Sequence, residues 1–296
     1  MISLVWKEPG LGSQQKLAQV KRLHSSERGR KGIGHCGTLD PFAEGILCVG
    51  MGEGTKLLSA LVGLSKTYVA EMVFGATTET LDSESELVFA DGVDLTHLTD
   101  EVLVSFLSAK VGKAEQIPPQ YSAVRVDGKR AYDLARKGET VELKARPMEI
   151  FAAKHLELAN LEREGRNLKK WKFEVSVSSG TYIRAFARDW AMGLSGSAGF
   201  LETLGRTQLG PWRLQTAQDR ALGVGDFSKL IPTVMVQDEA AAGLKHGRWN
   251  PACVPTVDEA ELRGYLVVAE ANPATPLALL NPDRSLQRVF VANPFD

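Results

Sequence analysis

The sequence predicts an α+β protein, with a mixed, mainly antiparallel sheet flanked by helices. Two alternating, β-rich runs support this prediction, at residues 66–74 and 171–177, because a strand directs successive side chains to opposite faces. Helical segments lie between the strand-like runs, and turn signals such as Asp127-Gly128 join some of the strands as hairpins. A smaller, acidic region with short strand-like runs follows residue 235, and we expect a second domain there.

The elements can be placed along the chain from these patterns. Ser13 is the expected N-cap of the first helix, and the paired prolines at 118 and 119 exclude a helix interior there. Strands are expected at residues 4–6, 46–49, 66–74, 124–126, 146–160, 171–178, 264–269, 277–280 and 288–292. Helices are expected at residues 13–28, 55–62, 99–111, 129–137 and 181–192, and the residues assigned to the two domains are 1–235 and 236–296.

Length and composition describe a globular protein of about two domains. The 296 residues are 44% hydrophobic and 24% charged, which is enough apolar content for a buried core. The sequence has neither an apolar run of about 18 residues nor the pattern of a signal peptide. Three cysteines, Cys36, Cys48 and Cys253, show no CxxC spacing. We therefore expect a cytoplasmic protein with reduced thiols and without a membrane partner.

Charge is unevenly distributed, although the formal net charge is only −1. The first 70 residues contain 9 Lys and Arg against 5 Asp and Glu, and residues 116–220 contain 18 against 12. Residues 71–115 and 221–296 are acidic. Such segregation can build a positive face for a polyanion on a nearly neutral protein, but solvated helices of mixed charge would give the same counts.

Residues 34–56 are the most unusual stretch, because six glycines there accompany one imidazole, His35, and one carboxylate, Asp40. The spacing Gly50-x-Gly52-x-Gly54-Thr55-Lys56 fits neither GxGxxG nor GxxxxGK[ST], which argues against a nucleotide-binding loop. The five histidines form no HExxH pair and no ligand spacing with cysteine. We therefore expect no metal site.

The same stretch resembles the signature of the TruB family of tRNA pseudouridine synthases, which is close to GHxGTLDPxAxGxLxxxxGxxTK. The similarity continues through four later blocks of the chain. They are Lys66-Thr67-Tyr68, Gln116 to Ala123, Gly128 to Tyr132 with Ala145-Arg146-Pro147, and Gly180-Thr181-Tyr182-Ile183-Arg184. Ordered blocks over so much of the chain are highly specific, whereas each residue alone would be read as a turn, a core position or a surface charge.

The resemblance implies a pseudouridine synthase fold with a small, mainly-β, PUA-like RNA-binding domain at the C-terminus. It implies that the chain converts uridine 55 in the T-loop of tRNA to pseudouridine, without metal or cofactor, and we expect a monomer. Asp40 would be the catalytic aspartate. His35 would help to displace the base and Tyr68 would stack on it. The uridine pocket would be completed by Tyr182, Arg184 and Leu204, with Arg184 paired to Asp40.

These residue types suit the reaction. The base must leave the RNA stack, which costs a few kcal/mol, and stacking on an aromatic ring such as that of Tyr68 recovers about 1–3 kcal/mol. A carboxylate can then attack the sugar or the base, or can deprotonate an intermediate, and the sequence leaves these paths open. An arginine beside Asp40 would keep a buried carboxylate charged.

Three departures from the family pattern affect the expected contacts. The DKPxGxTS-like block reads Lys7-Glu8-Pro9-Gly10-Leu11-Gly12-Ser13, so that Glu8 precedes the proline in place of lysine. Cys36 stands where threonine is common, and Gly205 replaces one arginine before Arg206. Two other functions remain as alternatives: an RNA-binding or tRNA-folding protein whose catalysis is incidental or lost, and a related synthase acting on another RNA.

Overall fold

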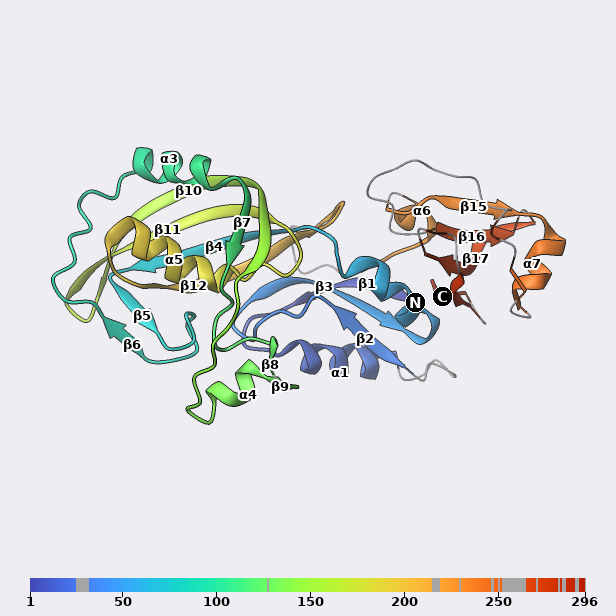
Figure 1. Cartoon of the computed structure of the whole chain (residues 1–296), viewed down its shortest axis with the longest axis horizontal. Coiled ribbons are helices and arrows are strands. Elements are labelled where there is room, and N and C mark those ends of the chain that lie inside the picture. Colours follow the sequence, from blue (N-terminus) through green and yellow to red (C-terminus); the bar gives the residue numbers. More distant parts are fainter. Residues whose placement is uncertain are drawn as a thin grey trace. The chain divides into compact units, whose positions relative to one another are not determined.

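The computed structural model describes residues 1–24, 32–126, 128–214, 219–228, 230–245, 248–249, 251, 265–269, 271–281, 283, 286–290 and 293–295. These residues divide into two compact units (Figure 1). Unit 1 comprises residues 1–41, 45–63 and 211–296, and unit 2 comprises residues 42–44 and 64–210. We describe each unit by itself.

The framework of unit 1 is an antiparallel array in which β14 pairs with β1, β1 with β3, and β3 with β2. Helix α1 packs on one face, where Leu17 and Val20 meet Val5, Leu47 and Val49. The elements of this part are β1 (Ile2–Lys7), α1 (Ser13–Leu23), β2 (Ile33–Cys36), β3 (Glu44–Met51), the 3-10 helix η1 (Gly52–Leu57), α2 (Leu58–Leu61), β13 (Trp212–Arg213), β14 (Arg220–Ala221) and α6 (Val224–Phe227).

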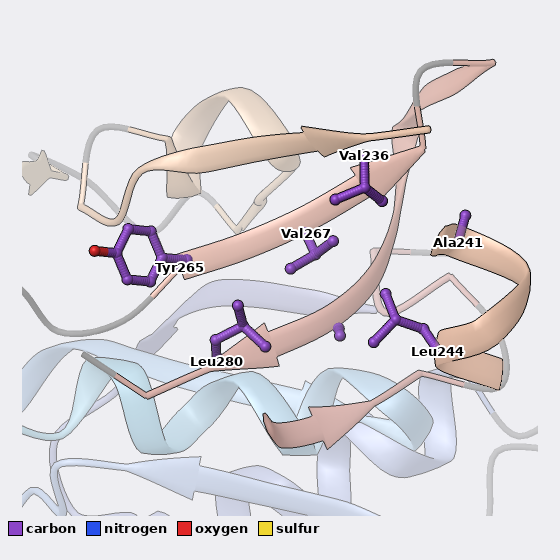
Figure 2. Packing of buried hydrophobic residues seen from close by; sticks show 7 residues of the cluster. Val236, Ala241, Leu244, Tyr265, Val267 and Leu280 are labelled. Carbon is purple, nitrogen blue, oxygen red and sulfur yellow. The ribbon is translucent and has the colours of Figure 1, made fainter. Parts of the chain in front are cut away.

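Unit 1 also contains a small sheet near the C-terminus, ordered β15-β16-β17-β18. Strands β15 and β16 are parallel and the other pairs are antiparallel. Figure 2 shows how Val267 and Leu280 of this sheet share one apolar core with Leu244 of α7. The elements are β15 (Thr233–Val236), α7 (Asp238–Lys245), β16 (Tyr265–Ala269), β17 (Asn272–Leu280) and β18 (Leu286–Val289).

Unit 2 is built on five antiparallel strands in the order β12-β4-β11-β10-β7. Helix α5 lies across β4 and β12, and α3 packs against β10 (Figure 1). Trp171, fully buried on β11, contacts the rings of Phe106 from α3 and Trp190 from α5. One aromatic core therefore fixes both helices to the same face of the sheet.

The elements of unit 2 are β4 (Lys66–Phe74), β5 (Ala76–Thr78), β6 (Leu87–Phe89), α3 (Asp100–Lys110), β7 (Gly112–Gln116), β8 (Arg125–Val126), β9 (Lys129–Arg130), α4 (Ala131–Ala135), β10 (Arg146–Arg163), β11 (Arg166–Val177), α5 (Ile183–Ser195) and β12 (Gly199–Leu209). The strand predicted at residues 66–74 and the helix predicted at 99–111 are confirmed, with Thr99 accepting the N-cap hydrogen bond from the amide of Val102.

The glycine-rich stretch of residues 34–56 is ordered secondary structure over most of its length, forming β2, β3 and η1. A Cβ on Gly50 would lie 2.7 Å from the carbonyl oxygen of Gly54, and a Cβ on Gly54 would lie 2.0 Å from that of Met1. Neither position has space for a side chain. These two glycines are required because segments of the protein itself pack closely against their backbone.

Several sequence expectations need correction. The N-cap of α1 is Gly12 and not Ser13, because the hydroxyl of Ser13 is bonded elsewhere. The segment predicted as a helix at 55–62 begins as the 3-10 helix η1, and the helix predicted at 129–137 begins with the short strand β9. Strands β2 and β12 were not predicted. The last residues of the first predicted helix, Asp127 of the predicted turn, Gly264, Cys253 and residues 291–292 lie outside the described residues. The division near residue 235 stays a prediction.

Candidate active site

The loop that carries Asp40 follows β2 and is anchored on both sides of the aspartate. On the N-terminal side, Ser13 Oγ donates to the carbonyl of Leu39 at 2.8 Å and accepts from the amide of Leu39 at 3.0 Å. On the C-terminal side, the carbonyl of Pro41 accepts from the amide of Gly10 at 2.8 Å. Asp40 is half-buried between these two anchors.

Lys7 strengthens the anchor at Pro41. Its side chain is fully buried, and Nζ donates to the carbonyls of Glu8, Leu11 and Pro41 at 2.9, 2.6 and 3.0 Å. A buried ammonium group needs acceptors for its three N–H bonds, and three carbonyl oxygens supply them. Lys7 therefore connects the chain after β1 to the residue that follows Asp40.

The departure at Glu8 leaves this anchoring lysine in place. Glu8 forms an ion pair with Lys16 of α1, with 3.0 Å between Nζ and Oε1. Burial raises the pKa of the Glu8 carboxyl, but the hydrogen bond from Lys16, a backbone hydrogen bond and the charges of Lys16 and Lys7 together bring that pKa below its ordinary value. Glu8 thus fastens the block at residues 7–13 to α1, while Lys7 provides the contact to the Asp40 loop.

His35 lies on β2, half-buried, opposite Val49 of β3. Its Nε2 lies 3.3 Å from Nε2 of Gln14 on α1. Strand pairing and this contact fix the imidazole five residues before Asp40. Within unit 1, both residues predicted from the glycine-rich stretch are thus held by α1 and by the block that precedes it.

Arg184, near the start of α5 in unit 2, is 5% exposed and joins segments that are far apart in sequence. Nη1 donates to the carbonyl of Thr80 at 2.9 Å, and Nη2 donates to the carbonyl of Tyr121 at 2.8 Å. Nη1 also lies 3.3 Å from Oδ2 of Asp82, whose side chain is 2% exposed. The pairing of Arg184 with Asp40 stays a prediction.

Asp82 lies in the acidic stretch of residues 71–115, and nothing in the sequence distinguished it from the other acidic residues there. Besides Arg184, its carboxylate accepts from the hydroxyl of Thr80 and from the amide of Glu84. The neighbouring acidic residues Glu79 and Glu84 are exposed, whereas Asp82 is buried, and the sequence does not show this difference. The Asp82 carboxylate balances the charge of Arg184 inside the protein.

Tyr68 and Leu204 lie on one face of unit 2, on the neighbouring strands β4 and β12. Leu204 is opposite Ala70 and Arg206 is opposite Tyr68, so all four side chains point to the same side. Tyr68, Leu204 and Arg206 are 7%, 5% and 1% exposed. The structure places Tyr68 and Leu204 on one face of neighbouring strands, with the buried Arg206 opposite Tyr68, and their roles in a uridine pocket stay predictions.

Tyr182 is the N-cap residue of α5 and is held by Gln116 at the end of β7. Gln116 Oε1 accepts from the amide of Tyr182 at 2.9 Å, and Gln116 Nε2 donates to its carbonyl at 3.0 Å. The ring packs against Val124, Ala131 and Leu143. Residues 116–123 are one of the blocks that resemble the family. In the structure, Gln116 of this block positions the backbone of Tyr182 through both hydrogen bonds.

Tyr121 from the same block lies over the loop that contains Asp82. Its hydroxyl donates to Oε1 of Glu79 at 2.7 Å, and this bond, together with burial and the charge of Glu79, raises the pKa of Tyr121. Arg184 and Tyr121 therefore hold the 79–82 loop at two points.

No group of three or more His, Cys, Asp or Glu residues in the described part of the chain is arranged to hold a metal ion. No helix among those residues is long and apolar enough to span a membrane.

Replacing Lys7 by Met tests the anchor at Pro41. We expect Lys7→Met to lower the free energy of unfolding by about 1–3 kcal/mol, since buried carbonyls lose their donor while the volume is kept. Lys21→Met, at an exposed position of α1, is the matched control and should change it by less than about 0.5 kcal/mol. Urea unfolding measures both, and equal effects would contradict the assigned anchor.

Asp82→Asn tests the ion pair inside unit 2. Removing one partner leaves the Arg184 charge buried, so we expect a loss of about 3 kcal/mol in the free energy of unfolding. Asp91→Asn is the control: Asp91 also pairs with an arginine, Arg166, but is 85% exposed and should contribute no more than about 1 kcal/mol. If the two variants unfold at the same urea concentration, the buried ion pair stabilises the protein no more than the exposed one, which would contradict the prediction.

Comparisons with known proteins identify the family of the chain. A family model described as TruB family pseudouridylate synthase (N terminal domain) matches residues 24–183. A tRNA pseudouridine synthase B from Corynebacterium aurimucosum is 34% identical over 301 residues, covering 98% of this chain and 95% of the relative. The protein of the same name from Mycobacterium leprae is 39% identical over 239 residues, covering 80% and 71%.

Solved structures support the fold. A chain in the crystal structure of a Cbf5-Nop10-Gar1 complex matches with a TM-score of 0.65 and 20% identity, covering 99% of this chain and 86% of that one. A chain of the archaeal box H/ACA sRNP Nop10-Cbf5 complex matches with a TM-score of 0.61 and 18% identity, covering 98% and 86%. At such identities the likeness shows the fold alone. The family model and the sequence relatives show more: this chain belongs to the TruB family of pseudouridylate synthases.

Proposed function

We propose that this pseudouridine synthase acts on tRNA and isomerises uridine 55 of the T-loop, with Asp40 as the catalytic carboxylate. The observation that carries the proposal is the two-sided anchoring of the Asp40 loop by Ser13, Gly10 and Lys7. A reacting carboxylate must be held within a fraction of an ångström of its target, and these contacts serve that need.

The other predicted residues have roles that fit their surroundings. Tyr68 would stack on the flipped uracil, Leu204 would complete the apolar wall beside it, and Tyr182 would line the pocket. His35 would help to displace the base. Arg184 would keep the carboxylate of Asp40 charged, and its own orientation is supported by the bonds to Thr80, Tyr121 and Asp82.

Exposed cations support an RNA substrate. Between residues 128 and 146 the exposed positive side chains are Lys129, Arg136, Lys137, Lys144 and Arg146. Tyr132, 39% exposed, has the Arg136 guanidinium 5.0 Å from its ring centroid. Cations interleaved with an aromatic ring suit a phosphate backbone and an unstacked base.

The remaining parts of the proposal concern organisation. We propose that residues 1–235 catalyse the reaction and that residues 236–296 form a PUA-like RNA-binding domain. The small sheet of β15 to β18 supports a division close to this position, although its first strand, β15, already begins at Thr233. We propose a monomer that works in the cytoplasm, where its tRNA substrate is present.

Asp40→Asn tests the catalytic assignment. The wild type should release tritium from tRNA labelled at uridine C5, because the C5 proton is lost when the new bond forms. Asp40→Asn should release less than about one part in a thousand of that rate while binding tRNA with an unchanged Kd. Asp91→Asn, at an exposed position, is the control. Equal release by wild type and Asp40→Asn would exclude Asp40 as the catalytic group.

The substrate assignment has a separate test. Mapping pseudouridine in the RNA of a deletion strain should show the loss of position 55 in tRNAs, with restoration by the wild-type gene. Loss at another RNA position instead would support the related-synthase alternative. Tight tRNA binding without pseudouridine formation by the wild type would support a binding or folding protein.

Substitutions at Tyr68 separate stacking from overall binding. We expect Tyr68→Leu to slow turnover about tenfold to a hundredfold and to change the Kd for tRNA by less than about twofold, because most binding energy comes from phosphate contacts. Tyr68→Phe keeps the ring and should keep most of the turnover. A large loss of binding with normal turnover in Tyr68→Leu would contradict the stacking role.

A further inference from the structure

Cys36 and Cys48 are direct partners across the β2–β3 ladder. Two backbone hydrogen bonds show which residues of β3 bond to β2 and which bond to β1. The amide of Gly52 donates to the carbonyl of Gly32, on the β2 side, at 2.8 Å, and the amide of Met51 donates to the carbonyl of Met1, on the β1 side, at 2.9 Å. Residues alternate along β3, so Gly50 and Cys48, like Gly52, form backbone hydrogen bonds with β2, and Cys36 and Cys48 are a hydrogen-bonded pair. A hydrogen-bonded antiparallel pair has Cα atoms about 5.5 Å apart, within the range of about 4.4–6.8 Å that a disulfide accepts.

The two thiols lie on the same face of the ladder. Ile33, Leu47 and Val49 pack toward α1, so alternation directs Cys36 and Cys48 to the opposite face. The neighbouring pair on that face is Gly34 and Gly50, where η1 and α2 approach closely. Both cysteines are reduced, with Cys36 4% exposed and Cys48 0% exposed.

The position of this pair gives it a consequence for the enzyme. A disulfide between Cys36 and Cys48 would enclose residues 37–47, the segment that contains Asp40. Opposed Cβ atoms in a ladder are about 4.5–5.5 Å apart, whereas a disulfide needs about 3.5–4.5 Å. Closing the bond would therefore draw the base of the catalytic loop together by about 1 Å.

We propose that Cys36 and Cys48 form an oxidisable thiol pair, a modification site that closes reversibly into a disulfide and lowers the turnover of the enzyme. The oxidant is a hydroperoxide, which is small enough to reach the slightly exposed Cys36. The sulfur of Cys36 attacks one peroxide oxygen, the O–O bond breaks, and a sulfenic acid and water form. The sulfur of Cys48 then attacks the sulfur of Cys36, the S–O bond breaks, and hydroxide leaves with the thiol proton of Cys48 as a second water. Two thiols lose two electrons, and the peroxide gains them.

The experiment uses the full chain with Cys253→Ser, so that Cys36 and Cys48 are the only cysteines. After treatment with hydrogen peroxide, we expect neither cysteine to react with an alkylating agent. The mass of the protein should be lower than that of the untreated protein by two hydrogens. Turnover of C5-tritiated tRNA should fall at least about tenfold, since a displacement near 1 Å at a reacting group has effects of this size, and dithiothreitol should restore it.

Single variants and an independent readout complete the test. Cys48→Ala in the same background should instead accumulate a dimedone adduct at Cys36 and form no disulfide within the chain. If a single variant does not fold, the thiol count and mass of Cys253→Ser decide the question, and neither depends on the identity of the substrate RNA. Thiols that stay fully alkylatable after peroxide, or a disulfide that forms without loss of turnover, would overturn the proposal.

Discussion

The anchoring of the Asp40 loop by a buried ammonium group is the constraint on which the rest of the site depends. Leu39, Phe42 and Ala43 of this loop are buried, and hydrogen bonds hold the backbone on both sides of Asp40. Lys7 contributes to this by placing three N–H donors where the carbonyls of Glu8, Leu11 and Pro41 converge. Since the bonds of a charged donor are stronger than those of a neutral one, a single side chain holds several turns of backbone in place.

Unit 2 uses the same physical device with a guanidinium group. Arg184 binds the carbonyls of Thr80 and Tyr121 and the carboxylate of Asp82, and so joins two loops to the start of α5. The cost of burying this charge is offset only because the carboxylate and the carbonyls surround it. In both units, a buried cation organises irregular backbone near residues that the family similarity assigns to the reaction, while the aromatic core around Trp171 holds the regular elements.

The structure explains two glycines of the glycine-rich stretch by close packing within the protein. The composition of this stretch suggests a loop that is free to approach RNA, yet Gly50 and Gly54 are needed because Gly54 and Met1 of the protein itself lie against them. Lys56, at the end of the motif, donates to the carbonyl of Val289 at 3.0 Å and pairs with Glu53. The end of the signature therefore serves packing between the N-terminal elements of unit 1 and its small sheet.

Periodicity and ordered motifs are local properties of the chain, so the sequence predicted the fold class, the family, the strand at 66–74 and the helix at 99–111, but not the long strand β12. It also selected Asp40, His35, Tyr68, Tyr182, Arg184 and Leu204 as candidates. The tertiary structure was needed to show that Lys7 is the anchor despite the altered block, that Asp82 is a buried partner of Arg184, and that Cys36 faces Cys48. These contacts join residues that are distant in sequence. They depend on burial and on strand register, and neither leaves a pattern among neighbouring residues of the chain.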